Sequence, residues 1–289
     1  MTLQTLHSGN VNDGVYVYGP LWQILDSVFG ITRQGEVVPN GKAGISASSL
    51  TESPVYINNT ISCGSKAGPG LRLYSRSAAY NTTVTNCGIG ISVEKGTWAG
   101  SQILLYNNTV RKCTTGISVG SGLKLNATNN LAFETTRSIV SDKQFPAPVL
   151  QTVNLENGTV HGVLLPPLVV ISSTEYVTIE LFGNPSSANV MEQKLGEITV
   201  AMTSIEGQGQ LLPIVFSNIS FGSRVQYLVA VALWHNTSIT EPSKPLQVDL
   251  SHIPACTLCV CSANNTILDC RTLVSVSVDI IMNRKEKIN

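Results

Sequence analysis

Charged residues are scarce in this sequence. Of its 289 residues, 12% are charged, with 18 Lys and Arg against 18 Asp and Glu, whereas a typical soluble domain has about 25% charged residues. Without net charge, the chain has no concentration of Lys and Arg with which to bind nucleic acid or an anionic membrane surface. Its hydrophobic content of 43% still excludes wholesale disorder. We therefore expect a folded protein without a polyanionic partner.

Long apolar runs are absent as well. The first residues, MTLQTLHSGNVNDG, are polar and lack the apolar core of a secretory signal. The longest apolar runs, Gly162–Ser172 and Val225–Trp234, are much shorter than the 18 or more residues of a spanning helix. We expect no membrane span in these residues, and we expect any secretory signal to be missing from them.

An internal repeat occupies the first half of the chain. Residues 107–119 read NNTVRKCTTGISV and residues 81–93 read NTTVTNCGIGISV, and a third copy begins at Asn58. Each unit contains short runs of alternating apolar residues separated by Asn, Gly or Ser, which is the pattern of short strands and turns. A unit this small cannot bury its apolar side alone, so the pattern predicts coils stacked on one another. We expect the glycine before each Ile or Leu to occupy a corner with positive φ, and the Asn column to bond from coil to coil.

This repeat resembles the right-handed parallel β-helix of pectate-lyase-like and many surface proteins. Hydrolysis in such proteins needs paired carboxylates, and β-elimination needs a cation beside a base. The acids in this half are isolated from one another, and the bases are scattered singly. The Asp-Asp, Gly-His-Gly and Arg-x-Lys motifs of the hydrolase families are missing. We therefore predict no catalytic residues, no cofactor and no metal; the alternative is a polysaccharide lyase or hydrolase whose catalytic residues are outside the chain or unrecognised.

Three cysteines recur once per coil. Cys63, Cys87 and Cys113 are 24 and 26 residues apart, so they can form a stacked column. The simplest interpretation is that each is a small buried apolar residue. A single Cys63–Cys87 or Cys87–Cys113 bridge is the alternative, and it would leave one thiol free.

The second half of the chain predicts an antiparallel unit. Strand-like segments with turn signals every 8–12 residues indicate a small sandwich. The stretch from Val177 to Pro185, with Leu195–Val200 and Tyr227–Leu233, resembles the immunoglobulin-like sandwich that follows β-helix repeats in some secreted surface proteins. The predicted strands are Thr152–Leu165, Glu175–Phe182, Gly196–Met202, Gln210–Phe216, Val225–Trp234 and Leu246–Leu250.

Four cysteines cluster near the C-terminus, at Cys256, Cys259, Cys261 and Cys270. A zinc ribbon would need two widely separated Cys-x2-Cys pairs, which this spacing does not provide. Together with the residues up to Ile280, the cluster resembles the N-terminal cap of extracellular leucine-rich repeats. The resemblance implies disulfides Cys256–Cys261 and Cys259–Cys270. Because no leucine-rich repeats follow, we expect the chain to be a piece of a longer ectodomain.

The sequence also carries eight Asn-x-Ser/Thr acceptors for N-glycosylation, about twice the number that chance would give. Turn chemistry is an alternative reason for the Asn residues that fall in the repeat. The acceptors are Asn58, Asn81, Asn107, Asn126, Asn157, Asn218, Asn236 and Asn264.

These observations predict an all-β chain: an incomplete right-handed parallel β-helix (1–143), an immunoglobulin-like sandwich (150–250), a disulfide-rich cap (254–282) and a disordered tail (283–289). The order of three extracellular-type modules without a catalytic constellation predicts a non-catalytic extracellular or cell-surface interaction or adhesion protein. We expect its ligand to be a protein or a polysaccharide at the cell surface.

Overall fold

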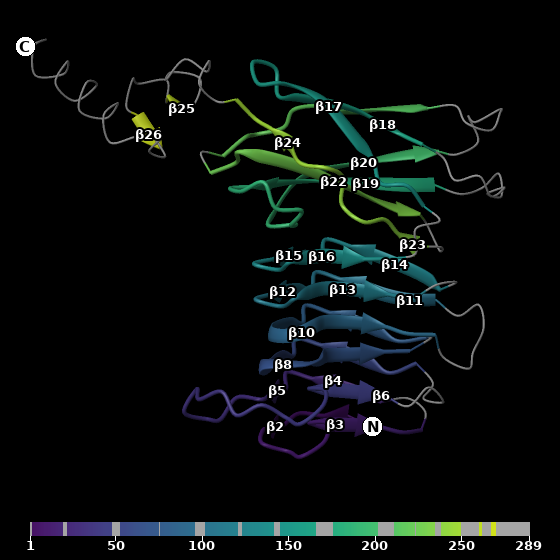
Figure 1. Ribbon diagram of the computed structural model, residues 1–289, viewed down its shortest axis with the longest axis vertical. Helices are drawn as coiled ribbons and strands as arrows, with labels where there is room; N and C mark the ends of the chain where they lie inside the picture. The colour runs from purple at the N-terminus through teal and green to yellow at the C-terminus, as the bar shows by residue number, and fades with distance from the viewer. Residues whose placement is uncertain are drawn as a thin grey trace, which may run out of the picture.

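The computed structural model contains strands and turns and no helix in the residues that it describes, as the all-β prediction requires. Along the long axis of the molecule, rungs of parallel strands are followed by antiparallel sheets (Figure 1). The described residues are 2–19, 22–47, 53–74, 76–95, 102–120, 123–141, 145–165, 176–201, 211–222, 224–234, 238–249, 260–261 and 267–269.

The first 140 residues form a solenoid with three parallel faces, which confirms the predicted stack of coils. Face A is the six-stranded sheet β1 (Thr2–Leu3), β4 (Gln23–Leu25), β7 (Val55–Ile57), β9 (Ala78–Tyr80), β11 (Gln102–Tyr106) and β14 (Lys124–Thr128). Face B contains β2 (Leu6–His7), β5 (Val28–Phe29), the first parts of β8 (Thr60–Leu73) and β10 (Thr83–Val93), β12 (Thr109–Arg111) and β15 (Leu131–Phe133). Face C contains β3 (Val15–Val17), β6 (Ile45–Ala47), the last parts of β8 and β10, β13 (Thr115–Val119) and β16 (Arg137–Val140).

The repeated apolar residues stack in register inside the solenoid. Val84 pairs with Val110, and Ile91 pairs with Ile117, which places residues 26 positions apart directly above one another. Their side chains are fully buried in one core that runs through all the rungs. Burial of every second side chain is the reason why the apolar positions alternate along each short strand.

The corner between faces A and B uses two residues per rung. The first residue has a positive φ, and Asn and Asp tolerate this conformation better than other side chains. The second residue points inward, and where it is asparagine its amide bonds to the neighbouring rungs: Asn108 accepts from the Thr82 N–H at 3.0 Å and donates to Asn130 Oδ1 at 3.0 Å. The rung-to-rung bonds thus come mainly from this second position. The positive-φ corner residues are Asp26, Asn58, Asn81, Asn107 and Asn129.

The glycines before face C have a different role from the one that the repeat predicts. Gly70, Gly90 and Gly116 do not have positive φ, so the prediction of a left-handed corner there is wrong. A Cβ on Gly90 would lie 2.2 Å from Val110 Cγ1, and a Cβ on Gly70 would lie 2.2 Å from Val84 Cγ1. Glycine is required here because the side chain packed against it leaves no room for a methyl group.

Two antiparallel sheets follow the solenoid and fit a sandwich. Most of the predicted strands are confirmed, but the segment predicted as Thr152–Leu165 is a hairpin with its turn at residues 155–158. Apolar residues of both sheets, including Trp234 and Phe216, share one core. One sheet contains β17 (Val149–Asn154), β18 (Thr159–Leu164) and β21 (Leu212–Phe216); the other contains β20 (Gln193–Ala201), β19 (Tyr176–Asn184), β22 (Tyr227–Trp234), β23 (Ser238–Ile239) and β24 (Leu246–Gln247).

The larger of these sheets lies across the last rung of the solenoid. Along β22, Leu228, Ala230 and Ala232 belong to the sandwich core, whereas Val229 and Val231 belong to the solenoid core. Met191 and Ala132 exchange backbone hydrogen bonds of 2.8 and 2.9 Å, which ends the parallel ladder of face B with an antiparallel bridge. The sheet therefore covers the apolar end of the solenoid.

Near the C-terminus, β25 (Val260–Cys261) pairs with β26 (Ile267–Asp269) in antiparallel fashion. The other predicted cap cysteines, Cys256, Cys259 and Cys270, and the side chain of Cys261 lie outside the described residues, so their pairing stays a prediction. In the described part of the chain, no helix is long and apolar enough to cross a membrane.

Candidate functional site

Face C carries a line of polar and aromatic side chains on its outer side. Tyr16, Ser46, Arg72, Ser92 and Ser118 lie in register on successive strands. They alternate with core residues such as Leu71 and Leu73, which directs them away from the core, but Ser46 and Ser92 are themselves only 1% and 6% exposed. Because rungs are about 4.8 Å apart, the line is an evenly spaced row along the solenoid axis.

Contacts between two neighbouring rungs gather part of this row into a cluster. Arg72 Nε lies 3.1 Å from Glu94 Oε1, and the Ser92 hydroxyl donates to the same oxygen at 3.0 Å. The Tyr74 hydroxyl also hydrogen-bonds Glu94. We call Tyr16, Arg72, Tyr74, Ser92 and Glu94 the Arg72 patch.

The patch is polar and has little net charge, because Arg72 and Glu94 form an ion pair and Tyr74 is neutral. Burial raises the pKa of Tyr74, and the negative charge of Glu94 raises it further, while Arg72 opposes the effect. Tyr74 is therefore a protonated hydrogen-bond donor at neutral pH. The Arg72 and Glu94 side chains are 34% and 40% exposed, so water screens their ion pair and the pair contributes about 1 kcal/mol or less to stability.

The backbone under the patch is rigid. The Glu94 N–H donates to the Leu73 carbonyl at 2.9 Å, which continues the parallel ladder past the end of β10. Leu73 and Val93, beside the patch residues, are almost fully buried in the solenoid core. Tyr16 stands out from this surface, with 59% of the residue exposed.

The acids of the solenoid are held apart from one another. Asp13 accepts from the Ala43 N–H at 2.9 Å, Asp26 accepts from Asn58 Nδ2 at 3.0 Å, and Glu134 lies 4.0 Å from Lys112. Glu94 is the carboxylate of the Arg72 patch, where it contacts Arg72 and Ser92. The carboxylates of Asp13, Asp26 and Glu134 are thus each paired with an amide or a cation and not with the second carboxylate that hydrolysis needs.

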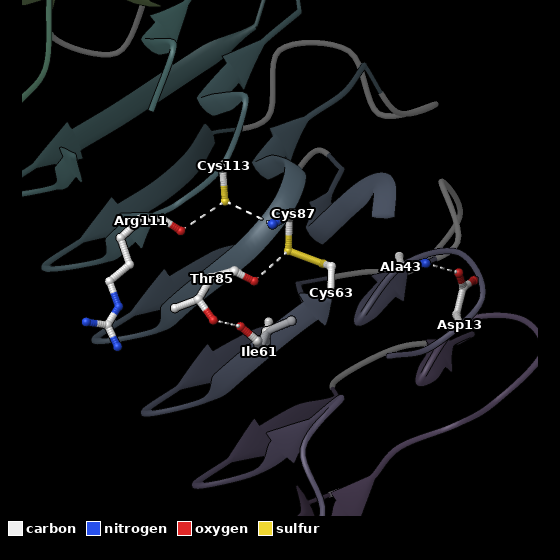
Figure 2. The surroundings of a disulfide bond; sticks show 8 residues. All are labelled: Asp13, Ala43, Ile61, Cys63, Thr85, Cys87, Arg111 and Cys113. Carbon is white, nitrogen blue, oxygen red and sulfur yellow. Dashed lines mark hydrogen bonds between the residues drawn. A yellow bond between two sulfur atoms is a disulfide. The ribbon is translucent and has the colours of Figure 1, made fainter. Parts of the chain in front are cut away.

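The solenoid cysteines do not share one role. A disulfide joins Cys63 and Cys87, with Cα atoms 4.8 Å apart, and Cys113 is a buried free thiol above them (Figure 2). The interpretation of all three as apolar filling is therefore wrong for Cys63 and Cys87, because stacking on adjacent rungs brings their Cα atoms within disulfide range. The alternative of a single bridge with one free thiol is confirmed.

The structure places six of the predicted glycosylation acceptors. Asn58, Asn81 and Asn107 occupy the positive-φ corner, side by side on adjacent rungs with exposed side chains. In the Asn157 turn the Thr159 hydroxyl donates to Asn157 Oδ1 at 2.6 Å. Turn chemistry thus accounts for the corner residues, while glycosylation stays a prediction. Asn126 is half-buried and Asn218 is exposed; Asn236 and Asn264 lie outside the described residues.

No group of three or more His, Cys, Asp and Glu side chains gathers in the described residues in a way that could hold a metal ion.

With three stacked faces and the cross-rung register established, the solenoid can be compared with known proteins. Residues 8–147 match the family model described as a right handed beta helix region. This beta helix region covers just under half of the chain. No curated protein matches the chain significantly.

Among solved structures, the chain is similar at a distance to the enzymatically active domain of tailspike protein 2 from bacteriophage CBA120. The two are 10% identical with a TM-score of 0.17, and the match covers 84% of this chain and 55% of that chain. The chain thus spans little more than half of that domain. A likeness at this level establishes neither fold nor activity for this protein.

The Arg72 patch is a feature that reasoning from single residues misses. Arg72 and Glu94 are 22 positions apart and look isolated in the sequence. The usable signal is the repeat itself, because aligning Gly70 with Gly90 places Arg72 over Ser92 and Tyr74 over Glu94. The outward-facing positions of the aligned coils therefore predict the cluster.

Proposed function

We propose that this protein is a non-catalytic extracellular or cell-surface recognition protein that binds a polysaccharide chain along face C of its beta helix region. The Arg72 patch carries this proposal. Tyrosine gives a large contact area at low entropic cost, serine gives adaptable hydrogen bonds, and arginine gives a planar fork of donors. Because Glu94 balances Arg72, the patch suits a neutral or weakly charged glycan.

The row geometry supports a polymer rather than a small ligand. Tyr16, Arg72 and Ser118, which are exposed or half-buried, recur at every second rung, about 9.6 Å apart, whereas Ser46 and Ser92 between them are almost fully buried. A chain lying along face C could therefore meet a hydrogen-bonding side chain at every second rung.

The Cys63–Cys87 disulfide supports the extracellular part of the proposal, because structural disulfides persist in oxidising compartments and are rare in the cytosol. The strand order supports an immunoglobulin-like assignment of the sandwich. Its sheets, β17-β18-β21 and β20-β19-β22-β24, follow the A-B-E and C′-C-F-G orders of such folds. We assign the sandwich the role of a spacer that closes the beta helix region.

The first prediction tests the patch by binding to a panel of immobilised polysaccharides. Arg72→Ala removes the donors and leaves Glu94 without its cation, so we expect affinity for any bound glycan to fall at least tenfold. Arg111→Ala is the matched control, because Arg111 is exposed on face B. Equal affinity of the two variants and the wild type would contradict the assignment of the site.

Activity is tested on the same polymers. Release of reducing ends by the wild-type protein that Glu94→Gln abolishes would overturn the non-catalytic part of the proposal and establish the enzyme alternative. Binding without release of reducing or unsaturated ends is the result we expect.

A further inference from the structure

Three cysteines stack on successive rungs at the corner between faces B and C. Thr85 pairs with Arg111, and Ile89 pairs with Thr115, so Cys87 and Cys113 are in equivalent positions on adjacent rungs. The Cys87 N–H donates to Cys113 Sγ at 3.3 Å. Figure 2 shows Cys63 and Cys113 on opposite sides of Cys87. Cys87 is thus the middle member of the column and has a cysteine on either side.

We propose that the disulfide of this column can migrate by one rung. The Cys113 thiolate attacks Cys87 Sγ, a Cys87–Cys113 bond forms as the Cys63–Cys87 bond breaks, and Cys63 leaves as a thiolate that takes up the proton lost by Cys113. One disulfide and one thiol are present before and after the step. The exchange therefore needs no oxidant or reductant.

Rung spacing permits either bond but not a third one. Adjacent rungs are about 4.8 Å apart, which lies within the Cα range of about 4.4–6.8 Å for disulfides. Cys63 and Cys113 are separated by two rungs, or about 9.6 Å, and cannot be bridged without backbone movement. Attack from the side opposite to the leaving sulfur also requires Cys87 to lie between the other two, as it does here.

Burial limits the rate of this exchange. Cys113 is only 4% exposed, so dissolved thiols reach it poorly and Cys87 is its accessible partner. Desolvation raises the pKa of Cys113, and the hydrogen bond from the Cys87 N–H partly opposes this effect. Because the thiolate is the attacking species, the rate should rise about tenfold per pH unit below that pKa.

Trypsin separates the three cysteines, which makes the exchange measurable in the full-length protein. Cleavage at Lys and Arg gives peptides 43–66, 77–95 and 113–124, each with one of these cysteines. The protein is incubated without added thiol at pH 7.5 or 8.5, unfolded under mildly acidic conditions, alkylated, deglycosylated and mapped by mass spectrometry. We expect alkylation of Cys63 to increase as that of Cys113 falls by the same amount, about tenfold faster at pH 8.5. Alkylation confined to Cys113 throughout at both pH values would overturn the proposal.

Variants give a second readout. When Cys63→Ser is folded under the oxidising conditions that form the wild-type disulfide, we expect peptides 77–95 and 113–124 to be disulfide-linked, whereas the control Cys113→Ser keeps the link between 43–66 and 77–95. A folded Cys63→Ser protein, with the wild-type circular dichroism spectrum and free thiols at both Cys87 and Cys113, would refute migration. If Cys63→Ser does not fold, the wild-type time course decides the question alone.

Discussion

At the scale of single residues, glycine is required in this protein for two different reasons, a positive φ or a lack of space for a Cβ. The sequence alone does not distinguish them. Gly64 and Gly158 have φ values of 56° and 63°, in the left-handed region where glycine is favoured. Gly90 has no such conformation, and its constraint is the Val110 side chain of the next rung. Because the neighbour comes from another coil, only the stacked structure distinguishes the two cases.

We predict that Gly90→Ala destabilises the protein by about 2–3 kcal/mol, because the added methyl group overpacks the core against Val110. The measurement is the free energy of unfolding from urea denaturation. Gly222→Ala serves as the control, since a Cβ there meets no atom within 4 Å, and it should stay within about 0.5 kcal/mol of the wild type. Similar stabilities for the two variants would show that the solenoid core yields more than this packing implies.

At the scale of elements, two neighbouring asparagines have different roles at the corner between faces A and B. Asn107 faces solvent in a left-handed conformation, while Asn108 is fully buried. Asn108 donates to the Ala79 carbonyl at 3.0 Å, and its own N–H donates to Asn130 Oδ1 at 3.1 Å. A strand made of only a few residues is thus held in register by side chains as well as by its backbone.

We predict that Asn108→Ala costs about 2–4 kcal/mol, because it leaves the buried Thr82 N–H without its acceptor, worth about 1–3 kcal/mol, and removes the bonds of the Asn108 amide to the Ala79 carbonyl and Asn130 Oδ1. Asn107→Gly should change stability by less than about 0.5 kcal/mol, because glycine tolerates positive φ. Thermal and urea unfolding of both variants check this prediction. The pair also separates glycosylation from folding: Asn108→Ala keeps the acceptor at Asn107, and Asn107→Gly removes it.

The sequence predicts strands and turns well where apolar residues alternate or repeat along the chain, or where turn residues mark an end. Recurrence of Val84 at Val110 and of Ile91 at Ile117 was enough to predict the coils, because the same contacts repeat in each. Contacts between side chains of different rungs join residues that are far apart in the sequence, so no pattern among neighbouring residues predicts them. The choice of Cys63 rather than Cys113 as the partner of Cys87 and the approach of Arg72 to Glu94 therefore required the structure. The hairpin after Asn154 was missed because Leu155 continues the apolar alternation into the turn.

At the scale of the whole molecule, the junction between solenoid and sandwich contains an almost buried carboxylate. Glu180 accepts from the Asn129 N–H at 2.9 Å and from Lys194 Nζ at 2.7 Å. Lys194 Nζ also donates to Glu197 Oε2 at 2.6 Å, so one ammonium group pairs with the carboxylates of both Glu180 and Glu197. Desolvation by burial outweighs these contacts and raises the pKa of Glu180 above its ordinary value.

A raised folded-state pKa fixes the sign of the pH dependence. The native protein binds this proton more tightly than the unfolded chain, so the stabilisation is present below the ordinary glutamate pKa and is lost as pH rises through the folded-state value. We predict that the stability difference between wild type and Glu180→Gln shifts against the wild type as pH rises from 4 to 7. Urea denaturation at several pH values measures it, with Glu197→Gln as the more exposed control. A difference that stays constant or grows with pH would contradict this account.

The sheet that lies across the last rung has a consequence for self-association. A parallel solenoid with a bare end can accept another solenoid end as its next rung, and head-to-tail addition of this kind has no natural limit and produces filaments. Here the antiparallel bridge between Ala132 and Met191 occupies the backbone groups of Ala132 on face B, and Phe182 and Val229 pack against the apolar end. The sandwich therefore prevents a second solenoid from pairing with this end of the first one.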